Sequence, residues 1–303
     1  MAHFFERTPI AELYRWFAGQ THRTSPTWEC LCLWIADQPW LLDQLDALPG
    51  QARQPNRFLA ALQFHDAPLE PGRALREWLE RHWSAVRQTI INRPTQTNEP
   101  GRLRALAPLW ASLPQPVSLL ELGASAGLCL LPDLLGFDDV TVAARLGVDA
   151  NPLDPCDEDT RRWLCSLVWP GEDERRRRLQ EALDIAVGLP PEVRVADLEE
   201  APERWIPNVV DELRARSPEA TVVVFHSMVL GYLPRAKRQS VVDVVRGSGA
   251  RWVAFEPRQV LAPLCDDEVP AAPPWGDTLL TLDGVPQAWC QPHGHRVEWL
   301  NPS

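Results

Sequence analysis

The chain has 303 residues, of which 45% are apolar and 23% charged, a composition typical of a globular protein and not of a disordered one. Its 30 basic residues stand against 41 acidic ones, and the net charge of −11 argues against a general affinity for nucleic acid. No run of about 18 apolar residues occurs, so no membrane-spanning helix is predicted. The length suffices for one large domain or two small ones.

The first residues of the chain and its cysteines indicate in which cellular compartment the protein is expected. The first residues, MAHFFERTPIAELYRWF, lack the basic head and apolar run of a secretory signal, so none is expected. None of the seven cysteines forms the Cys-x-x-Cys pairs that structural zinc requires. We therefore expect free thiols, no metal and a cytoplasmic location.

Residues 1–113 carry the periodicity of helices and are expected to form a helical cap region. Apolar residues recur at spacings of three and four in the segments 28–38, 74–91 and 101–113. Prolines stand where such helices would begin or end, as Pro39 does after the first of them. No segment of this half shows the alternation of a strand.

Residues 114–303 alternate short apolar runs with amphipathic segments, which predicts an α/β domain with a doubly wound, mostly parallel sheet. A helix is expected over 124–136, directly after the first strand. The last segment, 277–300, indicates an antiparallel pair or triplet at the edge of the sheet. The five strands expected before it are 117–123, 144–149, 193–197, 221–227 and 251–257.

The first expected strand ends in a glycine-containing loop, ELGASAG at 121–127. Ligands of open parallel sheets bind beyond the carboxyl ends of the strands, and this is the first such end. The dinucleotide fingerprint G-x-G-x-x-G is not matched, because Ser125 and Leu128 replace its second and third glycines. With no Walker pattern either, a phosphate-binding loop is disfavoured.

An S-adenosylmethionine site suits this loop better, because a sulfonium cofactor carries no phosphate and needs only close approach of the backbone. Asp149 ends the second strand, where its carboxylate would accept both ribose hydroxyls, as in dinucleotide folds. Asp197 ends the third strand and would meet the adenine amino group. The structural alternatives are a tight turn for the glycines and capping for the two aspartates. The expected cofactor-binding residues are Glu121, Gly123, Ala124, Ser125, Gly127, Asp149 and Asp197.

Two other interpretations of the same loop stay open. GASAG fits the G-x-S-x-G nucleophile elbow of hydrolases, with Ser125 as nucleophile and His226, His293 or His295 as the partner histidine. An elbow strand, however, normally follows several other strands, whereas the residues before this one look helical. The second interpretation is a non-catalytic protein that binds S-adenosylmethionine or a nucleoside, because a fold does not fix a function.

Several longer segments carry a family resemblance. The run LLELGASAG resembles motif I of class I S-adenosylmethionine-dependent methyltransferases. The wider sequence is similar to a bacterial family catalogued as a domain of unknown function (number 2332), on QTNEPGR at 96–102, ELGASAGL at 121–128, the segments around 147–170, VVVFHSMVLGYLP at 222–234, and PHGHRVEWL. This resemblance covers most of the chain and implies a methyltransferase-like fold, without implying a known reaction.

The sequence also departs from ordinary methyltransferases. The span between Asp149 and Asp197 is long, which loosens the assignment of Asp197. No Asp/Asn-Pro-Pro-Tyr motif follows the fourth strand, which disfavours methylation of nucleic acids or amides. His226 stands there instead and is the candidate catalytic base, because a neutral histidine suits proton removal near pH 7. A histidine that only hydrogen-bonds a loop is the structural alternative.

Further polar residues are expected to line the substrate or cofactor pocket. Three of them precede Pro100 and a helix, and we expect the helical half to lay them over the pocket; helix capping is the alternative. Arg102 would then pair with a carboxylate of cofactor or substrate. Glu256, at the end of the fifth strand, is expected to be structural. The predicted pocket residues are Gln96, Asn98, Glu99, Arg102, Ser227 and Tyr232.

Taken together, the sequence predicts a helical region followed by a methyltransferase-like α/β domain that binds S-adenosylmethionine. The expected activity is methyl transfer to a small molecule, with no nucleic-acid or membrane partner. The methyl acceptor and the oligomeric state stay open.

Overall fold

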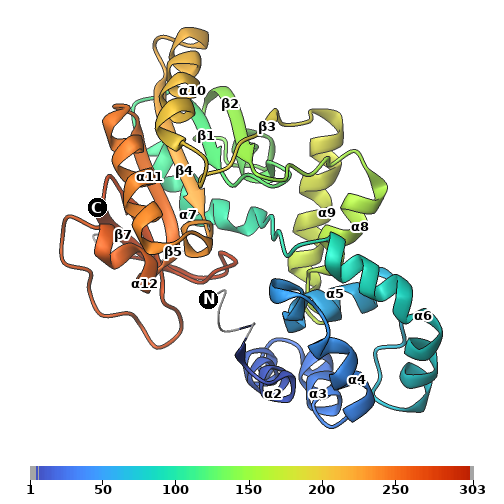
Figure 1. The fold of residues 1–303 in the computed structure, drawn as a ribbon. Coiled ribbons are helices and arrows are strands. Elements are labelled where there is room, and N and C mark those ends of the chain that lie inside the picture. Colours follow the sequence, from blue (N-terminus) through green and yellow to red (C-terminus); the bar gives the residue numbers. More distant parts are fainter. Residues whose placement is uncertain (1–4, 6, 301–303) are drawn as a thin grey trace. The chain divides into compact units, whose positions relative to one another are not determined.

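The computed structural model describes residues 5 and 7–300, and the chain divides into two compact units (Figure 1). A helical unit comprises Met1–Thr97 and Asp157–Gln180. A sheet unit comprises Asn98–Cys156 and Glu181–Ser303.

The helical unit is built from short helices with clear start signals. Proline occupies the first turn of α3, α4 and α5, where its missing N–H costs nothing. Ser25 caps α3 by accepting the N–H of Trp28, and Asp157 caps α8 by accepting that of Thr160. The helices are α2 (Ile10–Thr21), α3 (Pro26–Ile35), α4 (Pro39–Asp46), η1 (Gly50–Arg53), α5 (Pro55–Phe64), α6 (Arg73–Asn92), α8 (Glu158–Ser166) and the first half of α9 (Asp173–Gly188).

In the part of the chain that the structure describes, eight strands form one sheet with the order β3-β2-β1-β4-β5-β6-β7-β8. The first five pair in parallel and the last three add antiparallel strands, which confirms the expected mostly parallel sheet with an antiparallel edge. The strand order reverses between β1 and β4, the place where open α/β sheets bind ligands. The strands are β1 (Val117–Leu122), β2 (Val142–Asp149), β3 (Val193–Val195), β4 (Thr221–Ser227), β5 (Arg251–Pro257), β6 (Thr278–Leu282), β7 (Val285–Cys290) and β8 (Val297–Trp299).

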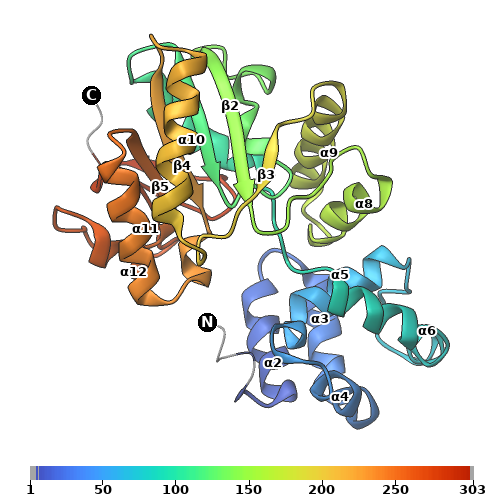
Figure 2. The same cartoon turned by 45° about the horizontal axis from the view of Figure 1, so that its top comes forward.

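Helices cover both faces of this sheet, and each face has its own apolar core. On one face α7 (Leu103–Ala111) packs with Val117 and Leu119 of β1. On the other, α10 (Pro202–Arg216) and α11 (Arg235–Gly247) lie side by side over Leu120 and Leu122 (Figures 1 and 2). Because successive side chains of a strand point to opposite faces, Glu121 belongs to the α7 face.

The division into units differs from the expected boundary at residues 113 and 114. Helix α7 belongs to the sheet unit, because Leu106 and Trp110 are buried in the core of one sheet face. Residues 157–180, in contrast, belong to the helical unit. There the Gln63 amide donates to the carbonyl of Ser166, and the rings of Phe64 and Trp163 pack edge to face.

The helix expected over 124–136 does not form. Two 3₁₀ turns replace it, η3 (Leu128–Leu130) and η4 (Pro132–Leu134). Ser125 and Gly127 adopt left-handed backbone angles, with φ of 53° and 71°, and Pro132 lacks the N–H that an α-helix would need. Apolar periodicity in this segment therefore reflects packing of an irregular loop.

The described residues, 5 and 7–300, contain no candidate membrane span, disulfide or metal cluster. None of the helices there is both long and apolar enough to cross a membrane. No disulfide links any of the seven cysteines. No group of three or more His, Cys, Asp and Glu side chains in these residues has the arrangement of a metal site.

The core on the α10–α11 face gives a first test of the fold. Leu120 is fully buried in β1, whereas Leu134 in η4 is 40% exposed. We expect Leu120→Ala to lower the free energy of unfolding by about 2–5 kcal/mol, because it leaves a cavity. Leu134→Ala should change it by about 0.5 kcal/mol or less. Urea denaturation of both variants measures this; equal effects would contradict the burial of Leu120 in this core.

Candidate functional site

The loop between β1 and the following 3₁₀ turn is held against the end of β2. The N–H groups of Gly123 and Ala124 both donate to the carbonyl of Val148, at 2.8 and 3.0 Å. The Ser125 N–H donates to Oδ2 of Asp149 at 2.7 Å, and the Asn151 N–H donates to Oδ1 at 2.8 Å. The Asp149 carboxylate therefore holds the loop against β2. As predicted from the sequence, Asp149 is the last residue of the second strand.

The loop needs its glycines for packing as well as for backbone conformation. Gly123 has φ of 72°, and a Cβ there would lie 2.5 Å from Cγ2 of Val229. A Cβ on Gly127 would lie 2.7 Å from Cβ of Pro191. Ser125 adopts a left-handed conformation that costs a non-glycine residue free energy. Such strain collects at functional sites, where surrounding contacts hold it in place.

Two polar atoms at this loop are buried with no hydrogen-bond partner among the described residues. They are Oε2 of Glu121, whose residue is 1% exposed, and Oγ of Ser125, whose residue is 4% exposed. Leaving a buried polar atom unpaired costs about 1–3 kcal/mol. Native proteins rarely accept that cost without a reason, and a ligand that binds these atoms is one such reason.

Burial raises the pKa of Glu121 well above its ordinary value. The Arg102 guanidinium opposes this rise and the Asp149 carboxylate adds to it. Glu121 thus retains a proton to higher pH than an exposed glutamate, and in that form it donates a hydrogen bond as well as accepting one.

Asn98 and Arg102, two of the predicted pocket residues, hold this site together from the sheet unit itself. The Asn98 side chain donates to the carbonyl of Ala124 at 3.1 Å and accepts the N–H of Leu128 at 2.9 Å. Arg102 donates to the carbonyl and the hydroxyl of Ser227, at 3.1 and 3.0 Å, and to the carbonyl of Pro292 at 3.2 Å. Both side chains are buried. Asn98 hydrogen-bonds to the backbone of the loop, and Arg102 hydrogen-bonds to the end of β4.

The other residues expected beside them are placed differently. Glu99 accepts the N–H of Gly101 at its own turn, which is the capping alternative. It also lies near His293, with 3.7 Å between Oε2 and Nδ1. Gln96 belongs to the helical unit, and Tyr232 is 71% exposed. Of the three residues that the helical half was expected to lay over the pocket, Gln96 belongs to the helical unit, whereas Asn98 and Glu99 belong to the sheet unit.

His226 lies on the face of the sheet opposite to Glu121, fully buried. The indole N–H of Trp252 donates to its Nε2 at 3.0 Å, which leaves the ring proton on Nδ1. Nδ1 then donates to Oε1 of Glu256 at 2.8 Å. Both ring nitrogens are engaged, and these contacts are those of a histidine that orders a loop. To act as the predicted base, His226 would first have to break the bond to Trp252.

Glu256, which the sequence led us to expect as structural, holds the segment after β4 through one carboxylate oxygen. Its Oε1 accepts the N–H groups of Val229 and Leu230, at 2.7 and 2.9 Å, in addition to the proton of His226. It thereby fixes the start of η5 (Leu230–Tyr232), the segment that follows β4. Because Val229 packs against Gly123, this carboxylate indirectly sets the shape of the glycine loop. An acid that ends a buried strand was the available signal.

Asp197 stands just after β3, half-buried, where its Oδ1 accepts the N–H of Glu199 at 2.8 Å. This is the Asx turn of the capping alternative.

The hydrolase interpretation requires a serine hydrogen-bonded to a histidine, and Ser125 has no such partner in the described part of the chain. Oγ of Ser125 bonds to no histidine there, and His226 is engaged elsewhere.

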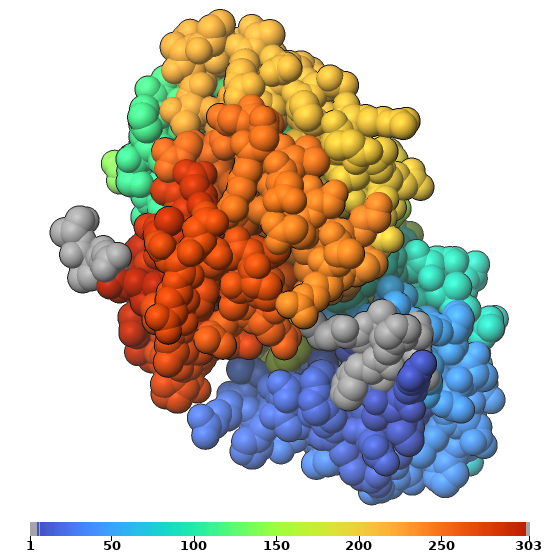
Figure 3. All heavy atoms as spheres, turned by 60° about the vertical axis from the view of Figure 1, so that its left-hand side comes forward, coloured from blue at the N-terminus to red at the C-terminus, as the bar shows by residue number. Residues whose placement is uncertain are grey.

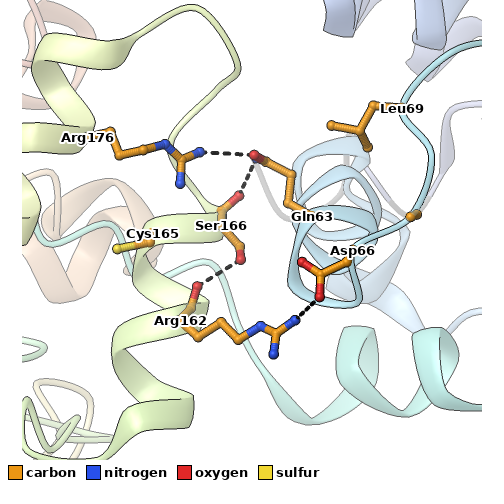
Figure 4. A pocket seen from close by; sticks show the side chains of 8 residues that line it. Gln63, Asp66, Leu69, Arg162, Cys165, Ser166 and Arg176 are labelled. Atoms are coloured by element: carbon orange, nitrogen blue, oxygen red, sulfur yellow. Dashed lines mark hydrogen bonds and ion pairs between the residues drawn. The ribbon is translucent and has the colours of Figure 1, made fainter.

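A cavity of about 460 Å³ lies in the helical unit, and its lining includes none of the predicted site residues (Figure 4). Its polar side chains pair with one another: Arg162 with Asp66 at 2.5 Å, and Arg176 with the Gln63 side-chain oxygen at 3.0 Å. A second cavity of about 400 Å³ lies between α11 and the helix that follows β5.

The open sheet, with a closed glycine loop at its strand-order reversal, places this chain among α/β proteins with a mostly parallel sheet. A family model described as "Uncharacterized protein conserved in bacteria (DUF2332)" matches residues 11–138 and 135–299, and the chain belongs to that family. The comparison with curated proteins finds no match.

The raised pKa of Glu121 predicts a pH-dependent effect on stability. The folded state keeps this proton to a higher pH than the unfolded chain, so stability contributed by protonated Glu121 is lost as pH rises above about 4.3. Glu121→Gln removes this loss. We expect the variant to gain stability over the wild type between pH 4 and pH 8, measured by urea denaturation. The exposed control Glu219→Gln should show no such trend; a parallel trend in both would refute the assignment.

Proposed function

We propose that the sheet unit binds S-adenosylmethionine at the loop 123–127 and transfers its methyl group to a small molecule. The observation that carries this proposal is the pair of buried, unpaired polar atoms, Glu121 Oε2 and Ser125 Oγ, beside Asp149 at the strand-order reversal. Support also comes from the parallel strand order 3-2-1-4-5, which nucleotide-binding sheets of the Rossmann type share.

The charge of the site favours a cationic nucleoside ligand over a pyrophosphate. The carboxylates of Asp149 and Glu99 lie at or near the loop, beside Glu121, whose raised pKa favours its neutral form. The guanidinium of Arg102 is a cation beside them and donates to carbonyl and hydroxyl oxygens. Carboxylates repel phosphate and attract a sulfonium group. The absence of the dinucleotide fingerprint points the same way.

Asp149 is the proposed ribose contact. Its two carboxylate oxygens accept the backbone N–H groups of Ser125 and Asn151. A carboxylate oxygen can accept more than one hydrogen bond, so the ribose hydroxyls would donate to the same carboxylate. Asp197 is the proposed adenine contact, with Oδ1 engaged in its own turn. Glu121, with both a donor and an acceptor available when protonated, is proposed to meet the polar end of the cofactor. The cofactor is proposed to lie against the backbone of the loop, at Gly123, Ala124, Ser125 and Gly127.

Bound S-adenosylmethionine would supply an electrophilic methyl group. The chain's own contribution would be to hold the acceptor in line with that methyl group and to exclude water, which is where much of the rate enhancement of such transfers arises. Because His226 is engaged by Trp252 and Glu256, no general base is assigned. The same engagement favours a second candidate function, binding of the cofactor without catalysis.

Calorimetric titration of the full chain with S-adenosylmethionine and S-adenosylhomocysteine tests the proposal. We expect micromolar binding, and at least tenfold weaker binding for Asp149→Asn, which removes the carboxylate charge that accepts the hydroxyls. Asp154→Asn is the matched control, because Oδ1 of Asp154 accepts an N–H two residues on, as Oδ1 of Asp149 does. Its affinity should equal that of the wild type.

No binding of either compound, or equal affinity of Asp149→Asn and wild type, would overturn the proposal. Binding without turnover against a panel of small-molecule acceptors would leave the non-catalytic function instead. Labelling of Ser125 by a fluorophosphonate would favour a hydrolase over both.

A further inference from the structure

The second cavity, of about 400 Å³, is a groove between α11 and α12 (Arg258–Leu261) with its continuation η6 (Ala262–Leu264). These segments lie at the surface of the sheet unit, in the orange part of Figure 3. No carboxylate lines the groove, although acids outnumber bases by 41 to 30 in the chain. Its lining consists of Arg235, Arg238, Gln239, Gln259, Val260, Pro263 and Leu264.

The positive charges of this groove are not neutralised by the described part of the chain. Arg235 has no hydrogen-bond or ion-pair partner there. Arg238 donates only to the carbonyls of Leu233 and Gly231, at 3.0 and 3.3 Å. The segments 228–242 and 257–264 contain four basic residues and no acid.

The nearest acids in sequence have partners of their own. Glu256, which precedes the second segment, accepts from His226, Val229 and Leu230. Asp243 accepts the amide of Gln239 at 2.8 Å, and Asp266 forms an ion pair with Arg246 at 3.0 Å. Two guanidinium groups therefore face a polar and apolar groove without a carboxylate. Guanidinium groups match the geometry of carboxylate and phosphate oxygens.

Helix stability does not explain these cations. Arg235, Lys237 and Arg238 occupy the first turn of α11, which has no acidic residue there and no side-chain cap. The N-terminal end of a helix is already positive, so basic residues at this end destabilise it. Their presence therefore asks for another explanation, and an anion that binds in the groove provides one.

The groove opens at the same edge of the sheet as the glycine loop. Helices α11 and α12 follow β4 and β5, so both begin near the carboxyl ends of these strands (Figure 2). Arg238 holds the backbone of η5 through its two carbonyl contacts. Val229, the residue before η5, packs against Gly123. The segment 229–232 therefore connects the groove, through Arg238, to the glycine loop, through Val229.

We propose that this groove binds the oxyanion of a small molecule, a carboxylate or a phosphate, between Arg235 and Arg238. The apolar Val260, Pro263 and Leu264 contact the body of the same ligand. The identity of this ligand as the methyl acceptor rests on the proposed function; the anion site itself does not.

NMR titration of the full chain at constant ionic strength, balanced with sodium chloride, tests the site. The probes are inorganic phosphate, followed by ³¹P line broadening, and succinate, followed by saturation transfer. We expect millimolar binding of at least one probe, and the better probe tells a phosphate ligand from a carboxylate ligand. Arg235→Gln should weaken binding at least fivefold, and its unpaired side chain makes misfolding unexpected.

The control is Arg87→Gln, which removes an exposed arginine of α6 in the helical unit. It should leave the affinity unchanged. The proposal is overturned if neither probe binds above the chloride background, or if both variants lower the affinity equally, which indicates adventitious attraction to exposed arginines.

Calorimetry with S-adenosylhomocysteine separates this inference from the proposed function. Arg235→Gln should bind S-adenosylhomocysteine as the wild type does. If the wild type binds S-adenosylhomocysteine but neither phosphate nor succinate, this inference alone is contradicted. Anion binding without binding of S-adenosylhomocysteine contradicts the proposed function alone and leaves the groove as an independent oxyanion site.

Discussion

The carboxylate of Asp149 accepts the N–H of Ser125, and the geometry of the candidate site depends on this contact. It draws the loop after β1 onto the end of β2, while two further N–H groups of the loop bind the carbonyl of Val148. A non-glycine residue is thereby held in a left-handed conformation. A charge-assisted hydrogen bond is among the few local interactions strong enough to hold such strain.

Side chains from three segments far apart in the sequence hold this loop and its neighbours in place. Asn98 bonds its backbone at two points, Arg102 ties β4 to the turn before α7, and Glu256 fixes the residue that packs on Gly123. Each of these side chains is almost fully buried. When nearly all groups of a buried polar network are hydrogen-bonded, the network favours a single conformation. Any other conformation would leave buried groups without partners, at a cost in free energy. Glu121 Oε2 and Ser125 Oγ at the loop have no partner among the described residues, and neither does the second oxygen of Glu256. The proposed ligand would bind the first two of these atoms.

The sequence was sufficient for the strands and for the loop, because both depend on local signals. Apolar runs ended by polar residues located β1 to β5, and glycines located the turn after β1. It was not sufficient for side-chain roles. Whether His226 is a base or an anchor depends on Trp252 and Glu256, which β5 brings beside it. The unit boundary was missed for a similar reason: α7 and α8 are both amphipathic, and only packing decides which core each one joins.

Different ionisable groups stand on the two faces of the sheet at the same edge. On the α7 face, Asp149 and Glu121 lie at the glycine loop with Arg102 as a cation nearby, whereas the groove at α11 and α12, on the other face, is lined by arginines without carboxylates. A net charge of −11 makes the second feature the more unusual one. A cationic cofactor and an anionic acceptor would each be attracted to one side and repelled from the other. Such a separation would orient both ligands before any side chain acts as acid or base, and it agrees with a site in which the one buried histidine of β4 is already engaged.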